Sequence, residues 1–241
     1  MNHKLTIAIE TSGRLGSVAI GRGGDFISET PFSGHMKHSA ELFSAMEALL
    51  IHIGATADDI DRVYITAGPG SFTGLRIAVT AAKMLGFAQE VNIAAADSMD
   101  VIAESASRFT AETGRTADCI ATILDAKKDL FYAAVFDRAG DDWQKCFDTQ
   151  IVTADKLLQW LESNGKKNVG LLGEGLVYYA EKFKAPFTYL LDEPYWAATA
   201  AGLFRVGNRM AEQGLFTDPL ALTPNYLRKP DAVVKRPKQK N

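Results

Sequence analysis

The sequence predicts an α/β protein of two lobes, each with a mixed sheet and helices. Two observations support this class. First, both halves of the chain show the same element order: three strands, a helix, a strand, a helix, a strand and a final helix. Second, a chain of 241 residues with 47% hydrophobic and 23% charged residues can build two lobes around a sizeable core. The order is duplicated, but the residues are not.

The first half opens with an apolar run and two glycine-bounded segments, which we predict to be an antiparallel meander. Apolar residues then recur at helical spacing, with Ser39 as the expected N-cap and Gly54 as the end of the helix. The predicted strands are 4–12, 14–24, 25–30, 61–70 and 91–97, and the predicted helices are 38–54, 73–89 and 98–109. The first lobe is assigned to residues 1–100.

The second half repeats this order, starting with two strands around the charged turn "DAKKD". Thr153 is the expected cap of its first helix. The predicted strands lie within 118–137 (two), 145–153, 168–175 and 187–191, and the predicted helices are 153–165, 176–183 and 195–214. The second lobe is assigned to residues 101–228, and residues 229–241 are predicted to be a disordered, basic tail.

Charge and composition exclude several classes of protein. The net charge of −3 does not favour a nucleic-acid clamp, and no stretch approaches the ~20 apolar residues of a membrane span. The basic tail is either a solubilising end or an arm that touches RNA. Cys119 and Cys146 form no CxxC motif, which favours reduced thiols and a cytoplasmic protein.

The loop from Gly68 to Gly74, "GPGSFTG", raises the question of phosphate binding. It lacks the Lys of a Walker A loop, and its G-x-G-x-x-x-G spacing is one residue too long for a dinucleotide fingerprint. Two interpretations remain. The loop binds an anion at a helix start, or its glycines let the backbone pass close to another element while Phe72 fills a pocket.

The helices at 38–54 and 73–89 carry apolar residues around most of their circumference. Such a helix is usually buried, either within its own chain or against a partner chain. Small residues on the second helix, among them Ala78, Ala81 and Ala82, leave room for a close neighbour.

Six stretches resemble, in the same order, those of the TsaB (YeaZ) family: 7–20, 38–43, 68–88, 124–136, 173–175 and 224–228. The stretch "GPGSFTGLR" is the most specific of them. The resemblance implies the actin-like, Hsp70-like ATPase fold. It also implies a role in making threonylcarbamoyladenosine at the position 3′ of the anticodon, in tRNAs that read codons beginning with A.

The resemblance implies a subunit without catalysis of its own, which scaffolds and activates a TsaD-like paralogue. A TsaE-like ATPase is a further expected partner, tRNA is reached only through the complex, and no membrane is involved. We expect no cofactor on this chain, with ATP and metal on the partner subunits. Alone, the chain is either a monomer or a homodimer. The expected partner interface lies on the two apolar helices: Phe43, Met46, Leu50, Ile77, Thr80 and Met84.

Two short segments of the chain correspond to nucleotide-binding segments of this fold superfamily. Thr11, Ser12 and Gly13 keep the shape of the superfamily's phosphate-binding hairpin, and "GEG" at 173–175 lies where such folds approach adenosine. We interpret both as relics of an anion or nucleotide site. The alternative function is an ATP-dependent kinase or hydrolase of the same superfamily.

The other polar groups give weaker signals. His35 and His38 are spaced as H-x-x-H without an evident third ligand, so we predict no metal site and solvent-facing histidines. Asp125 and Lys127 are expected to be solvated on their turn. No catalytic residue is assigned.

Overall fold

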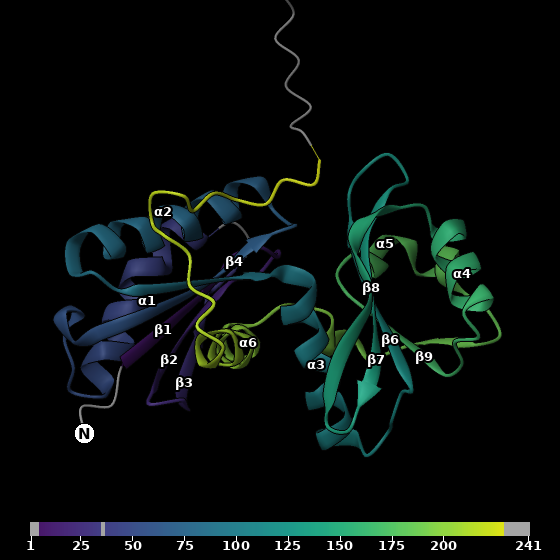
Figure 1. Cartoon of the computed structure of the whole chain (residues 1–241), viewed down its shortest axis with the longest axis horizontal. Helices are drawn as coiled ribbons and strands as arrows, with labels where there is room; N and C mark the ends of the chain where they lie inside the picture. Colours follow the sequence, from purple (N-terminus) through teal and green to yellow (C-terminus); the bar gives the residue numbers. More distant parts are fainter. Residues whose placement is uncertain (1–4, 35–36, 229–241) are drawn as a thin grey trace, which may run out of the picture.

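A computed structural model describes residues 5–34 and 37–228, and the predicted disordered tail at 229–241 lies outside this range. The chain forms two lobes around two five-stranded sheets (Figure 1). Each half follows the predicted element order, and the predicted α/β class with a mixed sheet in each lobe is confirmed.

The first sheet has the strand order β3-β2-β1-β4-β5. Strands β1, β2 and β3 pair antiparallel, and β4 and β5 continue from β1 in parallel. Its strands are β1 (Leu5–Glu10), β2 (Ser17–Arg22), β3 (Asp25–Pro31), β4 (Ile60–Gly68) and β5 (Asn92–Asp97), and α1 (His38–His52), the short 3-10 helix η1 (Ala57–Asp59) and α2 (Phe72–Gln89) connect them.

The second sheet repeats the pattern in the order β10-β9-β6-β7-β8. Its strands are β6 (Cys119–Asp125), β7 (Phe131–Ala139), β8 (Asp142–Val152), β9 (Val169–Leu172) and β10 (Thr188–Leu190). The connecting helices are α4 (Ala154–Ser163), α5 (Leu176–Tyr179) and the 3-10 helices η2 (Ala180–Phe183) and η3 (Glu193–Tyr195).

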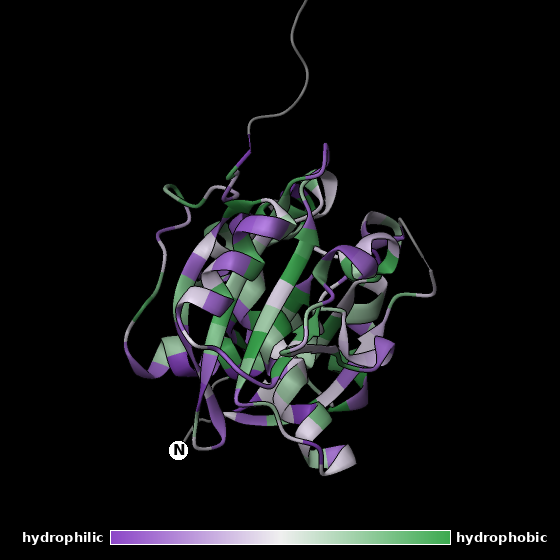
Figure 2. Cartoon of the chain, turned by 90° about the vertical axis from the view of Figure 1, so that its right-hand side faces the viewer, coloured by the Kyte–Doolittle hydropathy of each residue, from purple (hydrophilic) through white to green (hydrophobic). Residues whose placement is uncertain are grey.

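Two helices, α3 (Ser98–Thr113) and α6 (Ala200–Glu212), lie between the sheets. Their apolar faces share one core with side chains of both sheets, whereas α1 and α2 cover the other face of the first sheet. A third core joins the second sheet to α4 and α5. Figure 2 shows hydrophobic residues along the inner strands and hydrophilic residues at the outer turns.

Helix α6 belongs to the second half of the sequence but packs on the first sheet. The N–H of Ala200, at its start, donates to Ser17 Oγ at 2.9 Å and to a Glu29 carboxylate oxygen at 2.8 Å. A carboxylate at a helix N-terminus is stabilised by the free amides and by the helix dipole. Helix α6 therefore belongs in space to the first lobe, although it follows the second lobe in the sequence. The two lobes are not two consecutive stretches of the chain.

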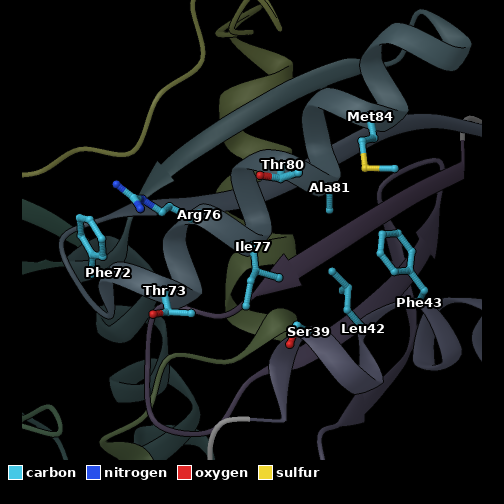
Figure 3. Close-up of a pocket in the computed structure, with 10 residues that line it drawn as sticks. All are labelled: Ser39, Leu42, Phe43, Phe72, Thr73, Arg76, Ile77, Thr80, Ala81 and Met84. Atoms are coloured by element: carbon cyan, nitrogen blue, oxygen red, sulfur yellow. The ribbon is translucent and has the colours of Figure 1, made fainter.

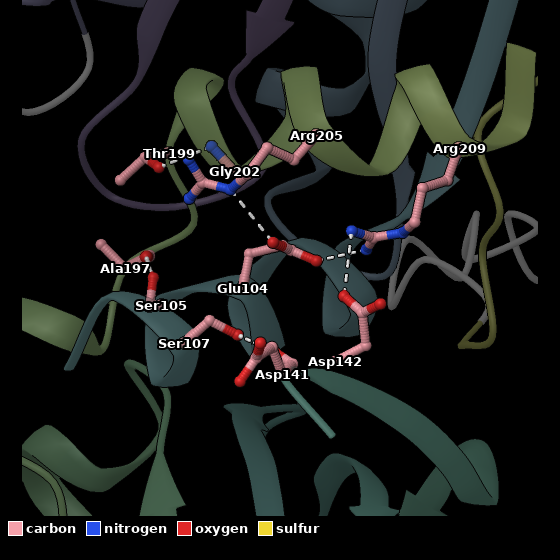
Figure 4. Close-up of polar contacts among 10 residues, drawn as sticks. All are labelled: Glu104, Ser105, Ser107, Asp141, Asp142, Ala197, Thr199, Gly202, Arg205 and Arg209. Atoms are coloured by element: carbon pink, nitrogen blue, oxygen red, sulfur yellow. Dashed lines mark hydrogen bonds and ion pairs between the residues drawn. The ribbon is translucent and has the colours of Figure 1, made fainter. Parts of the chain in front are cut away.

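A buried carboxylate joins α3 to α6 (Figure 4). Glu104, on α3, accepts hydrogen bonds from Arg205 Nε at 3.1 Å and from the Arg209 guanidinium. Arg209 also lies 3.8 Å from Asp142, at the start of β8. Because both Glu104 oxygens are paired with cations, its burial is compensated, and the network links the two central helices to the second sheet.

The helix caps were predicted with mixed success. The side chain of Thr153 accepts the Lys156 N–H at 3.3 Å, as expected of the α4 cap. The Ser39 prediction is wrong, because the N-cap of α1 is Lys37. The Lys37 carbonyl already accepts the N–H groups of Ala40 and Glu41, so Ser39 lies inside the first turn.

Candidate functional site

The glycine loop before α2 packs tightly against the turn between β1 and β2. Thr11 Oγ1 donates to the Gly74 carbonyl at 2.7 Å, and the Ser71 N–H donates to the Ser12 carbonyl at 2.8 Å. A Cβ atom on Gly74 would lie 1.8 Å from the Thr11 carbonyl oxygen, which no side chain permits. The close-crossover interpretation of this loop is therefore confirmed.

The buried carboxylate of Glu10 holds the neighbouring residue Ser12 of this turn. One Glu10 oxygen accepts both the Ser12 N–H and the Ser12 hydroxyl at 2.6 Å, and the other accepts the Thr66 hydroxyl at 2.5 Å. Burial raises the pKa of Glu10, and these hydrogen bonds to the ionised form oppose that shift only in part. The group ties the end of β1 to β4.

The next part of the same turn is held by the second lobe. The N–H of Arg14 donates to the Glu174 carboxylate at 3.0 Å, and the Arg14 guanidinium donates to the Tyr178 hydroxyl at 2.6 Å. A Cβ on Gly13 would lie only 3.3 Å from the same carboxylate. The two segments predicted as parts of an anion site, residues 11–13 and 173–175, thus lie together. The carboxylate that contacts this turn is the chain's own Glu174.

This occupation has a chemical consequence. A turn rich in backbone N–H groups attracts phosphate because its amides are positive and unpaired. Here the Arg14 amide already donates to Glu174, and a negative charge lies beside Gly13. A phosphate at this position would have to displace a carboxylate or lie against it.

A groove of about 390 Å³ opens between α1 and α2 on the outer face of the first lobe (Figure 3). Met84 and Phe43, from opposite helices, point toward one another across it, and they are 57% and 53% exposed. Its lining residues are Ser39, Leu42, Phe43, Phe72, Thr73, Arg76, Ile77, Thr80, Ala81 and Met84. Most of this lining is apolar, and Arg76 is its charged member.

Four of the six predicted interface residues line the groove: Phe43, Ile77, Thr80 and Met84. The other two need correction, because Met46 and Leu50 are only 5% and 7% exposed. They lie on the side of α1 that faces the sheet and serve the core of this chain. On α1, only Phe43 of the predicted interface residues remains a candidate. On α2, all three predicted residues remain.

Sequence reasoning missed Phe72 and Arg76 as part of this surface. Phe72 was expected to fill a pocket, yet it is half-exposed at the end of the groove. The signal was present, because Phe72, Arg76, Thr80 and Met84 are spaced four apart and so share one stripe of α2.

The C-terminal segment holds this end of the groove. We call residues 213–228 the strap, which runs from α6 along α2 (Figure 1). The ring of Tyr226 lies 5.0 Å from that of Phe72, and its hydroxyl accepts from Arg76 Nε at 3.0 Å. The Arg76 guanidinium also lies 3.8 Å from the centre of the Phe72 ring. Phe72 and Arg76 are therefore fixed before any partner arrives.

The remaining candidate groups make contacts of their own, away from the groove. His38 is buried and contacts the Phe32 ring, contrary to the predicted solvent exposure, and His35 lies outside the described residues. Among residues 5–34 and 37–228, no cluster of three His, Cys, Asp or Glu side chains could hold a metal ion. Lys127 pairs with Asp125 at 2.6 Å on an exposed turn. Within the same ranges, no helix is both long and apolar enough to cross a membrane.

Comparison with known proteins supplies the family. The family model described as "TsaD: tRNA N6-adenosine threonylcarbamoyltransferase" matches residues 30–205. The tRNA threonylcarbamoyladenosine biosynthesis protein TsaB of Bacillus subtilis is 27% identical over 95% of this chain and 96% of its own length. TsaB of Haemophilus influenzae is 21% identical over 76% of this chain and 78% of its own length.

The chain belongs to the family that this model describes, and the relatives that span most of it are named TsaB. Solved structures agree on the fold. YeaZ from Pseudomonas aeruginosa superposes with a TM-score of 0.78 at 21% identity, over 92% of this chain and 99% of the other. A Pseudomonas aeruginosa protein described as similar to peptidase YEAZ gives 0.79 at 22% identity, over 93% and 100%. The two lobes seen here are thus those of the YeaZ fold.

The contact between Gly74 and Thr11 can be tested by adding one methyl group. We expect Gly74→Ala to lower the free energy of unfolding by about 3 kcal/mol or more, because the new Cβ would overlap the Thr11 carbonyl. Urea denaturation monitored by circular dichroism measures the change. Gly34→Ala, where a Cβ meets no atom within 4 Å, should change stability by less than about 0.5 kcal/mol. Equal effects of the two substitutions would contradict the close contact between Gly74 and the Thr11 carbonyl.

The buried Glu10 predicts a pH dependence of stability. Its folded-state pKa is raised, so the folded protein holds this proton more tightly than the unfolded chain. Stability should therefore fall, relative to Glu10→Gln, as pH rises from the ordinary range of a glutamate through the raised pKa, by up to about 1.4 kcal/mol per pH unit. Urea denaturation at several pH values measures this difference.

Ile20→Val, an apolar change in the neighbouring strand β2, is the control. It should lower stability by a constant amount at every pH, since it removes no titrating group. A constant difference between wild type and Glu10→Gln would show that Glu10 ionises normally.

Proposed function

We propose that this chain is a non-catalytic subunit of the complex that adds threonylcarbamoyl to tRNA. The target is the adenosine 3′ of the anticodon in tRNAs that read codons beginning with A. In this proposal the chain docks a TsaD-like paralogue through the groove between α1 and α2, and so scaffolds and activates it. A TsaE-like ATPase joins the same complex. The assignment of the TsaB relatives to tRNA threonylcarbamoyladenosine biosynthesis supports this role.

The observation that carries the docking proposal is the groove itself. Large apolar side chains stand exposed on both of its walls, Phe43 on α1 and Phe72 and Met84 on α2. Exposed apolar surface of this kind, accompanied by polar residues such as Ser39 and Thr73, is typical of a protein-binding site. A standard interface buries about 800 Å² on each side, and both helices are long enough to supply it.

The β1–β2 turn supports the absence of catalysis by this chain. A transferase or kinase of this architecture would need amides open to a phosphate group at that turn. Here Glu174 of the second lobe already accepts the Arg14 amide. The proposal therefore assigns ATP and metal to the partner subunits and none to this chain.

A second copy of this chain is the other occupant that the groove would fit. Identical α1 and α2 pairs can pack face to face as an isologous contact. In the proposal such a homodimer forms only without the paralogue, because both would bury the same residues.

We expect Met84→Glu to keep the fold and weaken binding to the TsaD-like paralogue by at least about 100-fold, because a buried charge at the centre of an interface lacks a partner. Met84 is more than half exposed, so the substitution should leave stability nearly unchanged. Co-purification and calorimetric titration of the two subunits measure the change. Modification of tRNA by the reconstituted complex should fall in parallel.

Leu215→Glu is the matched control, since Leu215 is a similarly exposed apolar residue that follows α6 and does not line the groove. It should leave both binding and tRNA modification as in wild type. Unchanged affinity of Met84→Glu would exclude the groove. Full modification activity in a reaction that omits this chain would exclude the subunit role itself.

The rival function, an ATP-dependent kinase or hydrolase, has its own test. We expect isothermal titration of the lone chain with magnesium-ATP to show a Kd weaker than about 1 mM. The physical reason is the Glu174 carboxylate at the turn. Tight binding, together with an ATPase turnover that Thr11→Ala abolishes, would favour the rival.

A further inference from the structure

A second cavity lies between α3 and the hairpin that β7 and β8 form, and it shares no lining residue with the groove. Its volume is about 220 Å³, and its lining residues are Ser107, Thr110, Ala111, Arg138, Asp141 and Trp143. The first three belong to α3, and the other three belong to the hairpin. This volume equals that of about seven molecules of liquid water, so the cavity suits a small polar molecule.

The pairing of β7 with β8 brings the polar groups of the hairpin to the cavity. Arg138 and Trp143 are directly opposite each other in the antiparallel ladder, so their side chains stand on the same face of the hairpin. Gly140, with a φ of 68°, turns the chain between them, and its carbonyl accepts Arg138 Nε at 3.0 Å. Asp141 follows in the turn, and its carbonyl accepts the Ser107 hydroxyl at 3.5 Å (Figure 4). These contacts hold the walls of the cavity in place.

The cavity carries two opposite charges that are not paired with each other. In the part of the chain that the structure describes, neither the Asp141 carboxylate nor the terminal nitrogens of Arg138 have a hydrogen bond or an ion pair. The neighbouring network of Glu104, Arg209 and Asp142 leaves both groups out. Both charged groups are therefore open to a ligand.

Trp143 adds a buried donor that lacks an acceptor. Its indole N–H is shielded from solvent and has no hydrogen-bond partner among residues 5–34 and 37–228. The ring packs partly against the core between the two sheets. A buried donor without an acceptor is destabilising and is rare in folded proteins. The Trp143 side chain is thus a polar group of the cavity wall for which the chain itself supplies no partner.

We propose that this cavity binds a small α-amino acid, with the ligand carboxylate on Arg138 and the ligand ammonium group on Asp141. A guanidinium binds a planar carboxylate through two parallel N–H donors, and a carboxylate accepts the N–H groups of an ammonium ion. Asp141 would repel a purely anionic ligand, and Arg138 would repel a purely cationic one, so a molecule with both charges fits best. A small rotation of the Trp143 ring toward the ligand gives its N–H an acceptor.

The test titrates the full chain with three matched probes: L-alanine, propionate and ethylamine. Propionate is L-alanine without its amino group, and ethylamine is L-alanine without its carboxylate. In isothermal titration calorimetry we expect L-alanine to bind with a Kd of about 1 mM or tighter, and the other two probes to bind at least about tenfold more weakly. Propionate or ethylamine binding as tightly as L-alanine would overturn the inference. No binding of L-alanine up to about 10 mM would show that the cavity holds water only, and would also overturn it.

Two substitutions locate the binding in this cavity. Asp141→Asn removes the charge that holds the ammonium group, and Arg138→Gln removes the charge that holds the carboxylate. We expect each to weaken L-alanine binding at least about tenfold, because each leaves one charge of the ligand without a partner. Arg138 also donates to the Gly140 carbonyl, so its substitution affects the hairpin as well. The Asp141 carboxylate has no such contact, so Asp141→Asn keeps the fold, which circular dichroism verifies.

Matched controls lie at exposed positions that do not line the cavity. Asp148→Asn, on the same strand β8, and Arg22→Gln, at the end of β2, should bind L-alanine as the wild type does. Tryptophan fluorescence gives a second readout, which should change on binding and should lose this change in Trp143→Phe. Wild-type affinity in both Asp141→Asn and Arg138→Gln would place the binding elsewhere and overturn the inference. Because the lone chain is titrated, the outcome does not depend on the docking of a paralogue.

Discussion

The approach of Gly74 to the Thr11 carbonyl is the constraint on which the rest of this molecule depends. It fixes the start of α2 against the turn after β1, and so sets the direction in which α2 leaves the sheet. Ser71 caps the helix at that point by accepting the Gly74 N–H at 3.2 Å. A shift of this contact would move the whole stripe from Phe72 to Met84, because a helix transmits displacement rigidly along its axis. The glycine loop that suggests phosphate binding in the sequence thus sets the position of α2 and of the groove residues that it carries.

Carboxylates facing inward join the parts of the structure. Glu10 lies between β1 and β4, Glu104 between α3 and α6, and Glu174 between the second lobe and the β1–β2 turn. Each is paired with hydroxyl, guanidinium or amide donors, and removal of one partner would leave a buried or half-buried charge uncompensated. Such contacts favour one arrangement of the lobes. In the proposed role of a docking subunit this rigidity would favour binding, since less conformational freedom would be lost.

Sequence periodicity predicted the order of elements because strand and helix patterns are local. It could not assign the faces of α1, where apolar residues occupy most of the circumference, and it therefore placed the buried Met46 and Leu50 in the interface. Only the sheet beneath the helix decides which side is covered. Contacts over long sequence separations, such as Arg14 with Glu174 or Tyr226 with Phe72, leave no local pattern. The stripe of α2 was readable at four-residue spacing, yet Phe72 was expected to fill a pocket and Arg76 was given no role.

The strap contacts both the end of the groove and the second lobe, so these two parts of the surface lie next to each other. Tyr226 holds Phe72 and Arg76 at the end of the groove, and two residues later Arg228 binds the turn after β6. A partner seated on α1 and α2 would meet this boundary at one edge, next to a guanidinium that Tyr226 and Phe72 already orient. An oriented guanidinium favours a planar carboxylate or a phosphate over a neutral group. The edge of the groove beside Tyr226 therefore carries a positive charge that is already held in place.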